Sequence, residues 1–321
     1  MKKLILHLII LTCFILSASG QNEDMFIPSE LKQLTAVTEP ATLYRGFLKV
    51  GIDWQYAGFK RIFDENSNKY FVPGSTIARS SALNLSTHYG ITDKLQLNLD
   101  IPYMLDMVQS TILLDDPLFR AREQFDFQQK GYGLGDISTG LYVQLVKEQE
   151  NVPSITLRTT AILPTGRKNP SNFSSDSLIF DMSTGSGETS VAVDIQARKI
   201  LYPYSFTFYS GFDMGFGGNR VINPGEPEKS FRSGNIYYVA GGFNFHLNDW
   251  ICMTNDLYFT HIGPETLQDI TGDETKWQVN LIPYLHFQVQ QLRLVQGMFL
   301  PLMGKLTSAE PSYVFIIQYI F

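Results

Sequence analysis

The chain ends in the stretch Tyr313-Val314-Phe315-Ile316-Ile317-Gln318-Tyr319-Ile320-Phe321, which has an aromatic or bulky apolar side chain at every odd position. Successive side chains of a β-strand point to opposite faces, so a strand over this stretch would have one face that is lipophilic throughout. That face could be buried in a protein core or exposed to lipid. The rest of the sequence helps to decide between these two environments.

The beginning of the chain has the parts of a signal peptide. Lys2 and Lys3 precede an apolar run from Leu4 to Leu16, and the small residues Ala18-Ser19-Gly20 follow. We therefore expect a signal peptide over residues 1–20, with cleavage near Gly20. A membrane-spanning helix is the competing interpretation, but it needs about 20 apolar residues and this run is shorter.

Cys13 raises another interpretation, which is a lipoprotein signal. Thr12 precedes it where a small residue such as Gly or Ala is expected, and the apolar run continues beyond it, so we favour an ordinary signal peptide. We expect residues 21–40 to form an N-terminal periplasmic or plug segment. Residues 41–321 would then form the folded unit.

The composition limits the classes of function. The net charge is −6 and the basic residues form no cluster, which argues against nucleic acid as a partner. Cys252 is the single cysteine outside the expected signal peptide, so an intramolecular disulfide is excluded. After residue 20 no apolar run is long enough for a transmembrane helix. A structure that spans a membrane would have to be a closed β-barrel, which pairs its backbone groups without water.

Alternation of apolar and polar residues with a period of two recurs along the chain and predicts strands. Twelve such runs occur, at roughly residues 48–57, 83–89, 95–103, 137–145, 155–163, 191–195, 206–216, 237–245, 251–259, 277–289, 292–302 and 313–321. Counts of ten or fourteen strands stay open, because the eighth and ninth runs are weakly patterned.

The connections between these runs alternate between short and long. Short ones lie at 90–94, 147–153, 199–203, 248–250 and 290–291, and long ones at 58–76, 104–133, 164–187, 217–234, 261–274 and 304–312. Outer-membrane barrels have short periplasmic turns and long external loops. The sequence therefore predicts an all-β protein, a transmembrane antiparallel up-and-down β-barrel of twelve strands with both termini in the periplasm. The apolar connection at 104–133 could form a lid or a surface patch.

A soluble β-sandwich or a lipocalin-like barrel would also alternate, but its connections need not alternate in length. The chain's last strand resembles the terminal strand by which outer-membrane barrels are recognised for assembly, so Tyr319 and Phe321 are the expected assembly signal. This resemblance implies a Gram-negative outer membrane as the location. The expected partners are the barrel-assembly machinery, outer-membrane lipid and lipopolysaccharide.

In each strand, the residues that alternate with the lipophilic ones point to the other face and would face the lumen. The candidate charged lumen-lining residues are Lys49, Asp53, Asp100, Arg158, Asp194, Arg198, Asp213, Lys276, His286 and Arg293. Both signs are present, which argues against a strongly ion-selective pore. For any one of these charges, pairing inside the barrel is a commoner role than contact with a substrate, because isolated ions are costly to bury.

One sector of the expected lumen wall is apolar. Its candidate residues are Ile282, Val295, Phe299, Val314 and Ile316. Two interpretations compete: the N-terminal segment folds in as a plug and covers this wall, or the wall lines a route for an apolar solute. We favour the plug slightly, since protein usually covers a dry apolar surface.

Several short motifs together resemble a known family. They are Tyr89-Gly90-Ile91-Thr92-Asp93-Lys94-Leu95 leading to Ile101-Pro102-Tyr103, then Gly133-Leu134-Gly135-Asp136-Ile137, Leu163-Pro164-Thr165-Gly166 and Gly185-Ser186-Gly187-Glu188. In this order they resemble the outer-membrane transporters named for the phenol meta-degradation pathway, over roughly residues 41–321. The resemblance implies a barrel and suggests uptake of small compounds, aromatic ones among them. It supplies no binding residues.

Enzymatic and metal chemistry find little support in the sequence. No His/Cys spacing resembles a metal site, and no cofactor motif or catalytic residue is predicted. We expect a channel or transporter for small, hydrophobic or aromatic molecules. The alternatives are a closed structural or adhesive barrel and, less favoured, a lipid hydrolase like the twelve-stranded outer membrane phospholipase A. The sequence indicates neither the solute nor the oligomeric state.

Overall fold

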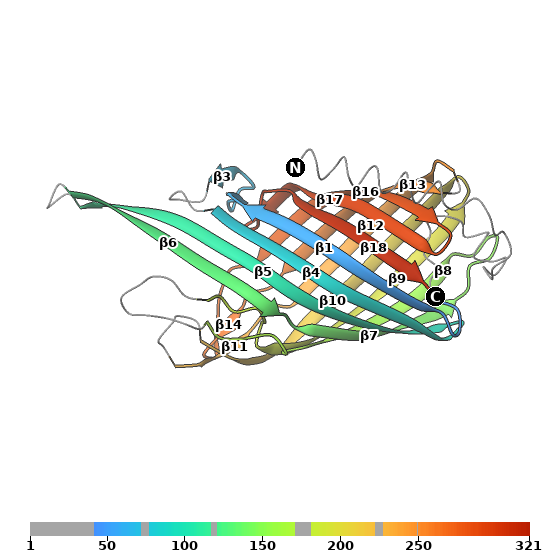
Figure 1. Cartoon of the computed structure of the whole chain (residues 1–321), viewed down its shortest axis with the longest axis horizontal. Coiled ribbons are helices and arrows are strands. Elements are labelled where there is room, and N and C mark those ends of the chain that lie inside the picture. Colours follow the sequence, from blue (N-terminus) through green and yellow to red (C-terminus); the bar gives the residue numbers. More distant parts are fainter. Residues whose placement is uncertain (1–41, 72–76, 117–120, 171–180, 222–226, 249) are drawn as a thin grey trace.

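The computed structural model is a closed β-barrel of twelve strands, which confirms the predicted fold and strand number. It describes residues 42–321 except 72–76, 117–120, 171–180, 222–226 and 249 (Figure 1). The barrel strands are β1 (Leu48–Phe59), β4 (Ile77–Thr92), β5 (Leu95–Asp116), β7 (Ile137–Val146), β8 (Ser154–Leu163), β9 (Glu188–Leu201), β10 (Tyr204–Arg220), β12 (Ile236–His246), β13 (Ile251–Ile262), β16 (Lys276–Val289), β17 (Leu292–Lys305) and β18 (Ser312–Ile320).

Each barrel strand pairs antiparallel with its neighbours in the chain, and the last strand returns to the first. Between β18 and β1 the register matches Lys49 with Ile320 and Ala57 with Ser312. The terminal residue extends this seam, because the amide of Phe321 donates to the carbonyl of Leu48 at 2.7 Å. The closed sheet therefore has no free edge along its circumference, as a lipid environment requires.

The barrel is apolar outside and polar inside. On β5, Leu97 and Leu99 are 42% and 38% exposed, while Gln96 and Asn98 beside them are 5% and 3% exposed. A water-soluble protein would bury the leucines instead. This arrangement is that of a transmembrane barrel, whose outer face contacts lipid.

Exposed aromatic side chains lie near both ends of the barrel. Near the end with the long loops they include Trp54, Tyr103, Phe216, Phe259 and Tyr313. Near the end with the short turns they include Tyr89, Tyr204, Trp250, Tyr319 and Phe321. Two such belts are typical of the two membrane–water interfaces.

Six further strands lie outside the barrel wall, in the long connections. They are β2 (Arg61–Phe63), β3 (Lys69–Phe71), β6 (Ala121–Leu134), β11 (Lys229–Arg232), β14 (Thr266–Leu267) and β15 (Ile270–Thr271). The hairpin of β2 and β3 lies beside the loop after β17, where Arg61 pairs with Glu310 at 2.7 Å and Phe63 is 1% exposed. Between two other loops, the Lys168 ammonium donates to the Glu228 carboxylate at 2.9 Å and lowers the pKa of that carboxyl.

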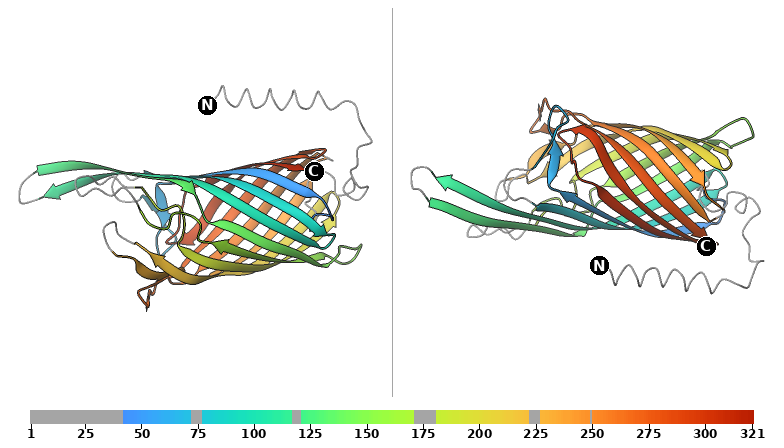
Figure 2. Two further views of the ribbon diagram at one scale, coloured as in Figure 1. Left: turned by 60° about the horizontal axis from the view of Figure 1, so that its bottom comes forward. Right: turned by 90° about the horizontal axis from the view of Figure 1, so that it is seen from above.

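The structure differs from the sequence expectation at residues 104–133. We expected a loop that forms a lid or a patch, but β5 continues to Asp116 and pairs with β6 over fourteen residue pairs. The resulting two-stranded ribbon projects well beyond the barrel and does not fold over its mouth (Figure 2). The alternation that predicts strands is imposed by lipid, so it fades where a strand leaves the membrane.

The predicted signal peptide and N-terminal segment lie outside the described residues, so both stay predictions. Among the residues that are described, no helix is long and apolar enough to cross a membrane.

Candidate functional site

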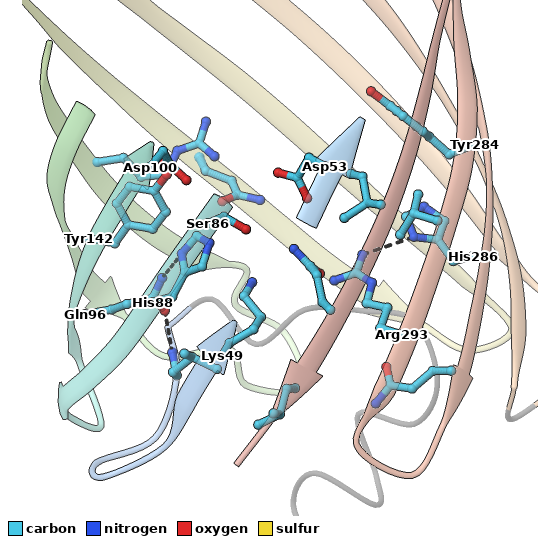
Figure 3. A pocket seen from close by; sticks show the side chains of 18 of the residues that line it. Lys49, Asp53, Ser86, His88, Gln96, Asp100, Tyr142, Tyr284, His286 and Arg293 are labelled. Carbon is cyan, nitrogen blue, oxygen red and sulfur yellow. Dashed lines mark hydrogen bonds between the residues drawn. The ribbon is translucent and has the colours of Figure 1, made fainter. Parts of the chain in front are cut away.

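A cavity of about 410 Å³ lies inside the barrel, in the half nearer the short turns (Figure 3). Many strands contribute to its lining, because every second residue of each strand faces inward. The residues predicted from the sequence that line it are Lys49, Asp53, Asp100, Arg158, Val295, Ile316, His286 and Arg293. A cavity of this size can accept a small organic molecule.

Arg293 is held in the cavity by a histidine. Its Nη2 atom donates to His286 Nδ1 at 3.0 Å, and His286 Nε2 lies 3.1 Å from the Thr254 hydroxyl oxygen. Arginine can only donate hydrogen bonds, so Nδ1 must be an acceptor and the ring proton lies on Nε2. The imidazole is therefore neutral and orients the guanidinium toward the cavity.

A second ion-pair network lies farther along the wall. Arg158 Nε lies 2.5 Å from Asp194 Oδ1, and the Tyr238 hydroxyl donates to the other carboxylate oxygen at 2.9 Å. The guanidinium also lies over the rings of Tyr142 and Tyr209, at 5.5 and 5.2 Å from their centroids. Buried ions of both signs are thus paired and hydrogen-bonded, which offsets the cost of taking them out of water.

Glycines on neighbouring strands let large side chains lie flat on the lumen wall. A Cβ atom at Gly297 would overlap the ring of Tyr284, and one at Gly211 would overlap Tyr238. These rings can occupy the space of the missing side chains only because the neighbouring residue is glycine. Tyr284 lines the cavity, so its flat position keeps part of the lumen open.

The segment before β1 closes part of the short-turn mouth. The Leu43 amide donates to Gln96 Oε1 at 2.7 Å, and the Leu43 side chain is 4% exposed and lines the cavity. The Gly46 amide donates to the carbonyl of Gly90 at 2.8 Å. A Cβ at Gly90 would collide with the backbone of Tyr44, so the glycine of this turn motif is needed where the segment packs.

The five residues of the predicted apolar wall lie on the neighbouring strands β16, β17 and β18. Val295 and Ile316 are directly paired and line the cavity. Ile282 and Val314 are 4% and 5% exposed, and Phe299 packs edge to face against Tyr284 with ring centroids 6.4 Å apart. The wall is therefore continuous with one side of the cavity.

The remaining predicted residues do not line the cavity. Arg198 lies 3.6 Å from Glu148, near a short turn. Lys276 Nζ lies 3.0 Å from Glu265 Oε1, at the end with the long loops. Asp213 accepts a hydrogen bond from the side chain of Ser190.

The cavity also has neutral polar residues beside the predicted charged and apolar ones. They include Ser86, Gln96, Gln196, Gln288 and Gln318. Their alternate positions on the strands are enough to place them in the lumen, because every second residue of a strand faces inward. Leu43 precedes the first strand and carries no periodic signal, so sequence patterning could not have found it.

Three of the family motifs meet at the long-loop end of the barrel. Asp136 Oδ1 accepts the Gly166 amide at 2.9 Å, and Oδ2 accepts the Ser186 amide at 2.6 Å and its hydroxyl at 2.7 Å. Gly166 and Gly185 pack so closely that a Cβ on either would lie within 3 Å of the other's backbone. The motifs therefore form one structural junction, at the other end of the barrel from the cavity.

A serine and a histidine also come together, between β10 and β12. Ser205 Oγ lies 3.4 Å from His246 Nε2, but Ser205 is 0% exposed and its hydroxyl oxygen accepts a hydrogen bond from Asn244 at 2.9 Å. A catalytic nucleophile must be reachable by its substrate. This pair is therefore better explained as a buried hydrogen bond. Among the described residues no cluster of metal-ligating side chains occurs.

The structure aligns with several solved structures. An outer membrane channel from Pseudomonas putida F1 aligns with a TM-score of 0.66 and 13% identity over 89% of this chain and 99% of that one. The P. putida toluene transporter TodX aligns with a TM-score of 0.47 and 8% identity over 88% and 92%. The CymD monoaromatic hydrocarbon channel gives 0.43 and 10% identity over 94% of both chains. At 13% identity, the alignment with the channel from Pseudomonas putida F1 shows a shared fold and nothing more.

A comparison with curated protein sequences finds no significant match. The sequence profile of one family does match, over residues 104–290, and its description is "Putative MetA-pathway of phenol degradation". This match spans more than half of the chain and contains the three motifs that meet at Asp136. It agrees with the resemblance inferred from the sequence. The protein therefore belongs to the family of that description, and it is a β-barrel of the outer-membrane type.

Proposed function

We propose that the protein is a channel of the Gram-negative outer membrane that passes small molecules, with apolar or aromatic compounds among its solutes. The observation that carries this proposal is the cavity of about 410 Å³ inside a barrel whose outer face is lipophilic. A barrel with a purely structural role would gain stability from filling that space with side chains.

The chemistry of the lining supports an aromatic or partly apolar solute. The rings of Tyr142, Tyr209 and Tyr284 line the cavity together with the side chains of Val295 and Ile316. Aromatic rings favour offset or edge-to-face contact with other rings, and aliphatic side chains favour any apolar surface. The name of the family, which refers to phenol degradation, points in the same direction.

We also propose how the barrel is oriented in the outer membrane and which molecules it contacts there. The short turns and Phe321 would lie in the periplasm, and the long loops and the β5–β6 ribbon outside the cell. Lipid would surround the apolar outer face, with lipopolysaccharide in the outer leaflet. The barrel-assembly machinery would recognise the last strand through Tyr319 and Phe321, whose rings pack together at 4.7 Å.

Liposome swelling tests the proposal directly. Purified protein reconstituted into liposomes should allow small sugars and benzenesulfonate, a charged aromatic that does not cross lipid unaided, to enter, because the cavity would form part of a water-filled path. The control is heat-unfolded protein at the same lipid ratio. Correctly folded barrels that admit neither solute would exclude the channel and favour a closed structural or adhesive barrel.

The lipid hydrolase alternative predicts a different result. Such an enzyme would release fatty acid from phospholipid vesicles, and replacement of Ser205 by alanine would abolish that release. We expect no release from either protein, because Ser205 is fully buried.

A further inference from the structure

One side chain in the cavity wall does not belong to the barrel. Leu43 lines the cavity, and every other described residue that lines it lies on a barrel strand. The barrel strands are fixed in place, because each of them is hydrogen-bonded to a neighbour on both sides. Leu43 is therefore the lining residue that can move without breaking the sheet.

Leu43 belongs to residues 42–47, a segment directly before β1 that we call the strap. Thr42 and Leu43 are 3% and 4% exposed, whereas Arg45 and Gly46 are exposed. The first residues of the strap are thus buried in the short-turn mouth of the barrel, and its later residues face the solvent.

Three hydrogen bonds hold the buried part of the strap to β5 and to the turn before it. The Thr42 hydroxyl donates to the carbonyl of Asp93 at 3.1 Å, and the Arg45 amide donates to the carboxylate of Asp93 at 3.0 Å. The Leu43 amide donates to the side chain of Gln96 at 2.7 Å. A segment held by a few such bonds and one buried apolar side chain opens at far lower cost than a strand of the barrel.

Gln96 is held in position to accept its bond from the strap. Its Nε2 atom donates to Asn98 Oδ1 at 2.5 Å, and Gln96 is 5% exposed. Gln96, His88 and Lys49 lie close together at this end of the cavity (Figure 3). The barrel wall thus offers a fixed acceptor for the strap in the position seen here.

Two glycines lie where the strap meets the barrel. Gly46 has a φ of 83°, which residues other than glycine rarely adopt, and a Cβ there would have nothing within 4 Å. Gly90 on β4 has no such space, because a Cβ there would overlap the carbonyl oxygens of both Leu43 and Tyr44. Rotation at Gly46 can therefore release the strap, and the absent side chain of Gly90 lets it dock.

We propose that the strap is the periplasmic gate of the channel and that Leu43 is the side chain that obstructs the way out of the cavity. The position seen here is the closed state. Solutes leave when the strap swings out about Gly46, while the barrel wall stays unchanged. This inference rests on the channel function proposed above and assigns the residues that control it.

Two variants open the gate in different ways. Gly90→Ala places a Cβ where the carbonyl oxygen of Tyr44 lies, so the strap cannot dock. Leu43→Ala removes the obstructing side chain and keeps the main-chain hydrogen bond to Gln96. Both should raise single-channel conductance in a planar bilayer above the wild-type value, with the larger rise for Gly90→Ala.

Each opening variant has a matched control that should conduct like wild type. Gly58→Ala controls for Gly90→Ala, because Gly58 also lies on a barrel strand and a Cβ there would have nothing within 4 Å. Leu247→Ala controls for Leu43→Ala, because Leu247 follows β12 at the same end of the barrel, is 50% exposed and does not line the cavity. Heat-dependent gel mobility verifies that each variant folds.

A disulfide can hold the gate closed. Arg45→Cys and Asp93→Cys are combined in a Cys252→Ala background, because the Arg45 amide lies 3.0 Å from the Asp93 carboxylate and both residues are exposed. The oxidised protein should conduct less than the same protein after reduction, since the strap cannot swing out. The single variant Asp93→Cys in the same background is the control and should not respond to reductant. Loss of free thiol verifies that the bond has formed.

The outcomes separate the gate from the channel itself. If wild type carries current and Gly90→Ala does not exceed it, or if reduction of the disulfide leaves the current unchanged, the gate proposal is wrong while the channel stands. A disulfide that fails to form would contradict the docked position of the strap. If Gly90→Ala raises the current and Leu43→Ala does not, the role assigned to Leu43 is wrong.

Two further outcomes concern a silent wild-type protein. If wild type carries no current and Gly90→Ala does, both the channel and its gate are supported. If wild type and both opening variants are folded and carry no current, both proposals are overturned.

Discussion

Leu97 and Asn98 show how the environment acts on single residues. They are neighbours on β5, yet Leu97 is 42% exposed and Asn98 is 3% exposed. Leu97 lies next to Tyr89 and Leu141 on the adjacent strands, which are also exposed. The apolar side chain faces lipid and the amide faces the lumen.

Placing a charge at Leu97 should therefore destabilise the protein in a bilayer. Because Leu97 pairs with Tyr89 of the short-turn belt, Leu97→Arg should lower the free energy of unfolding by about 1 kcal/mol, the cost near an interface and not the larger cost at the bilayer midplane. Leu97→Phe is the control and should stay close to wild type, because phenylalanine is also lipophilic. Denaturant titration in lipid vesicles measures both. An unchanged stability of Leu97→Arg would refute the lipid-facing assignment.

Gly297 controls the width of the lumen through the ring of Tyr284. Gly297→Ala should push this ring into the cavity and reduce single-channel conductance, because the added Cβ overlaps the ring. Gly241→Ala is the matched control. Nothing lies within 4 Å of a Cβ at Gly241, so conductance should not change. Equal conductance of both variants and wild type would show that Tyr284 does not limit passage.

At the scale of elements, the three turns that carry the family motifs are joined to one another by hydrogen bonds. Asp136 accepts hydrogen bonds from Gly166 and Ser186, so it joins the start of β7 to the loop between β8 and β9. The ribbon of β5 and β6 starts beside it, where the Gly135 amide donates to the carbonyl of Pro102 at 2.8 Å. The junction therefore fixes the loops at the point where the ribbon leaves the barrel.

Removing one acceptor oxygen should weaken this junction. Asp136→Asn should lower the free energy of unfolding by about 1–3 kcal/mol, since a part-buried donor loses its charged partner. Asp273→Asn is the control, because Asp273 lies exposed in another external loop. Both are measured by denaturant titration in vesicles. Equal stability of the two variants would argue that the junction is dispensable.

The sequence predicted the barrel strands because lipid imposes strict alternation on them. β12 and β13 were weakly patterned, yet they pair over eleven residue pairs. The ribbon was not predicted, because its strands continue beyond the region where one face must be lipophilic. The alternation within a strand shows which side chains point to the lumen. The sequence does not show the register between neighbouring strands, and contacts such as that of Arg158 with Asp194 depend on this register.

For the whole molecule, the closing seam is the critical feature. Phe321 links β18 to β1 through backbone hydrogen bonds with Leu48, at 2.7 and 3.3 Å. A barrel that fails to close would leave unpaired backbone groups in lipid, which is very costly. The last residue therefore contributes to both closure and, as proposed, recognition during assembly.

Deletion of Phe321 should reduce the amount of folded protein in the outer membrane severalfold, because one exposed ring and two hydrogen bonds of the seam are lost. Phe321→Ala keeps the backbone, so it separates recognition of the ring from closure. Fractionation and heat-dependent gel mobility measure the folded amount. Normal levels of both variants would contradict a role for this residue in assembly.

The central claim is that the barrel is lipophilic outside and open to water inside. Leu99 and Asp100 test it, because they are neighbours on β5 and face opposite sides. Single cysteines at each position, in a Cys252→Ala background, are labelled with a charged, membrane-impermeant thiol reagent and with a lipid-sensitive fluorophore in vesicles. We predict that the charged reagent modifies Asp100→Cys and that only Leu99→Cys gives a lipid-embedded fluorescence signal. The reverse pattern, or equal labelling of both, would contradict the account.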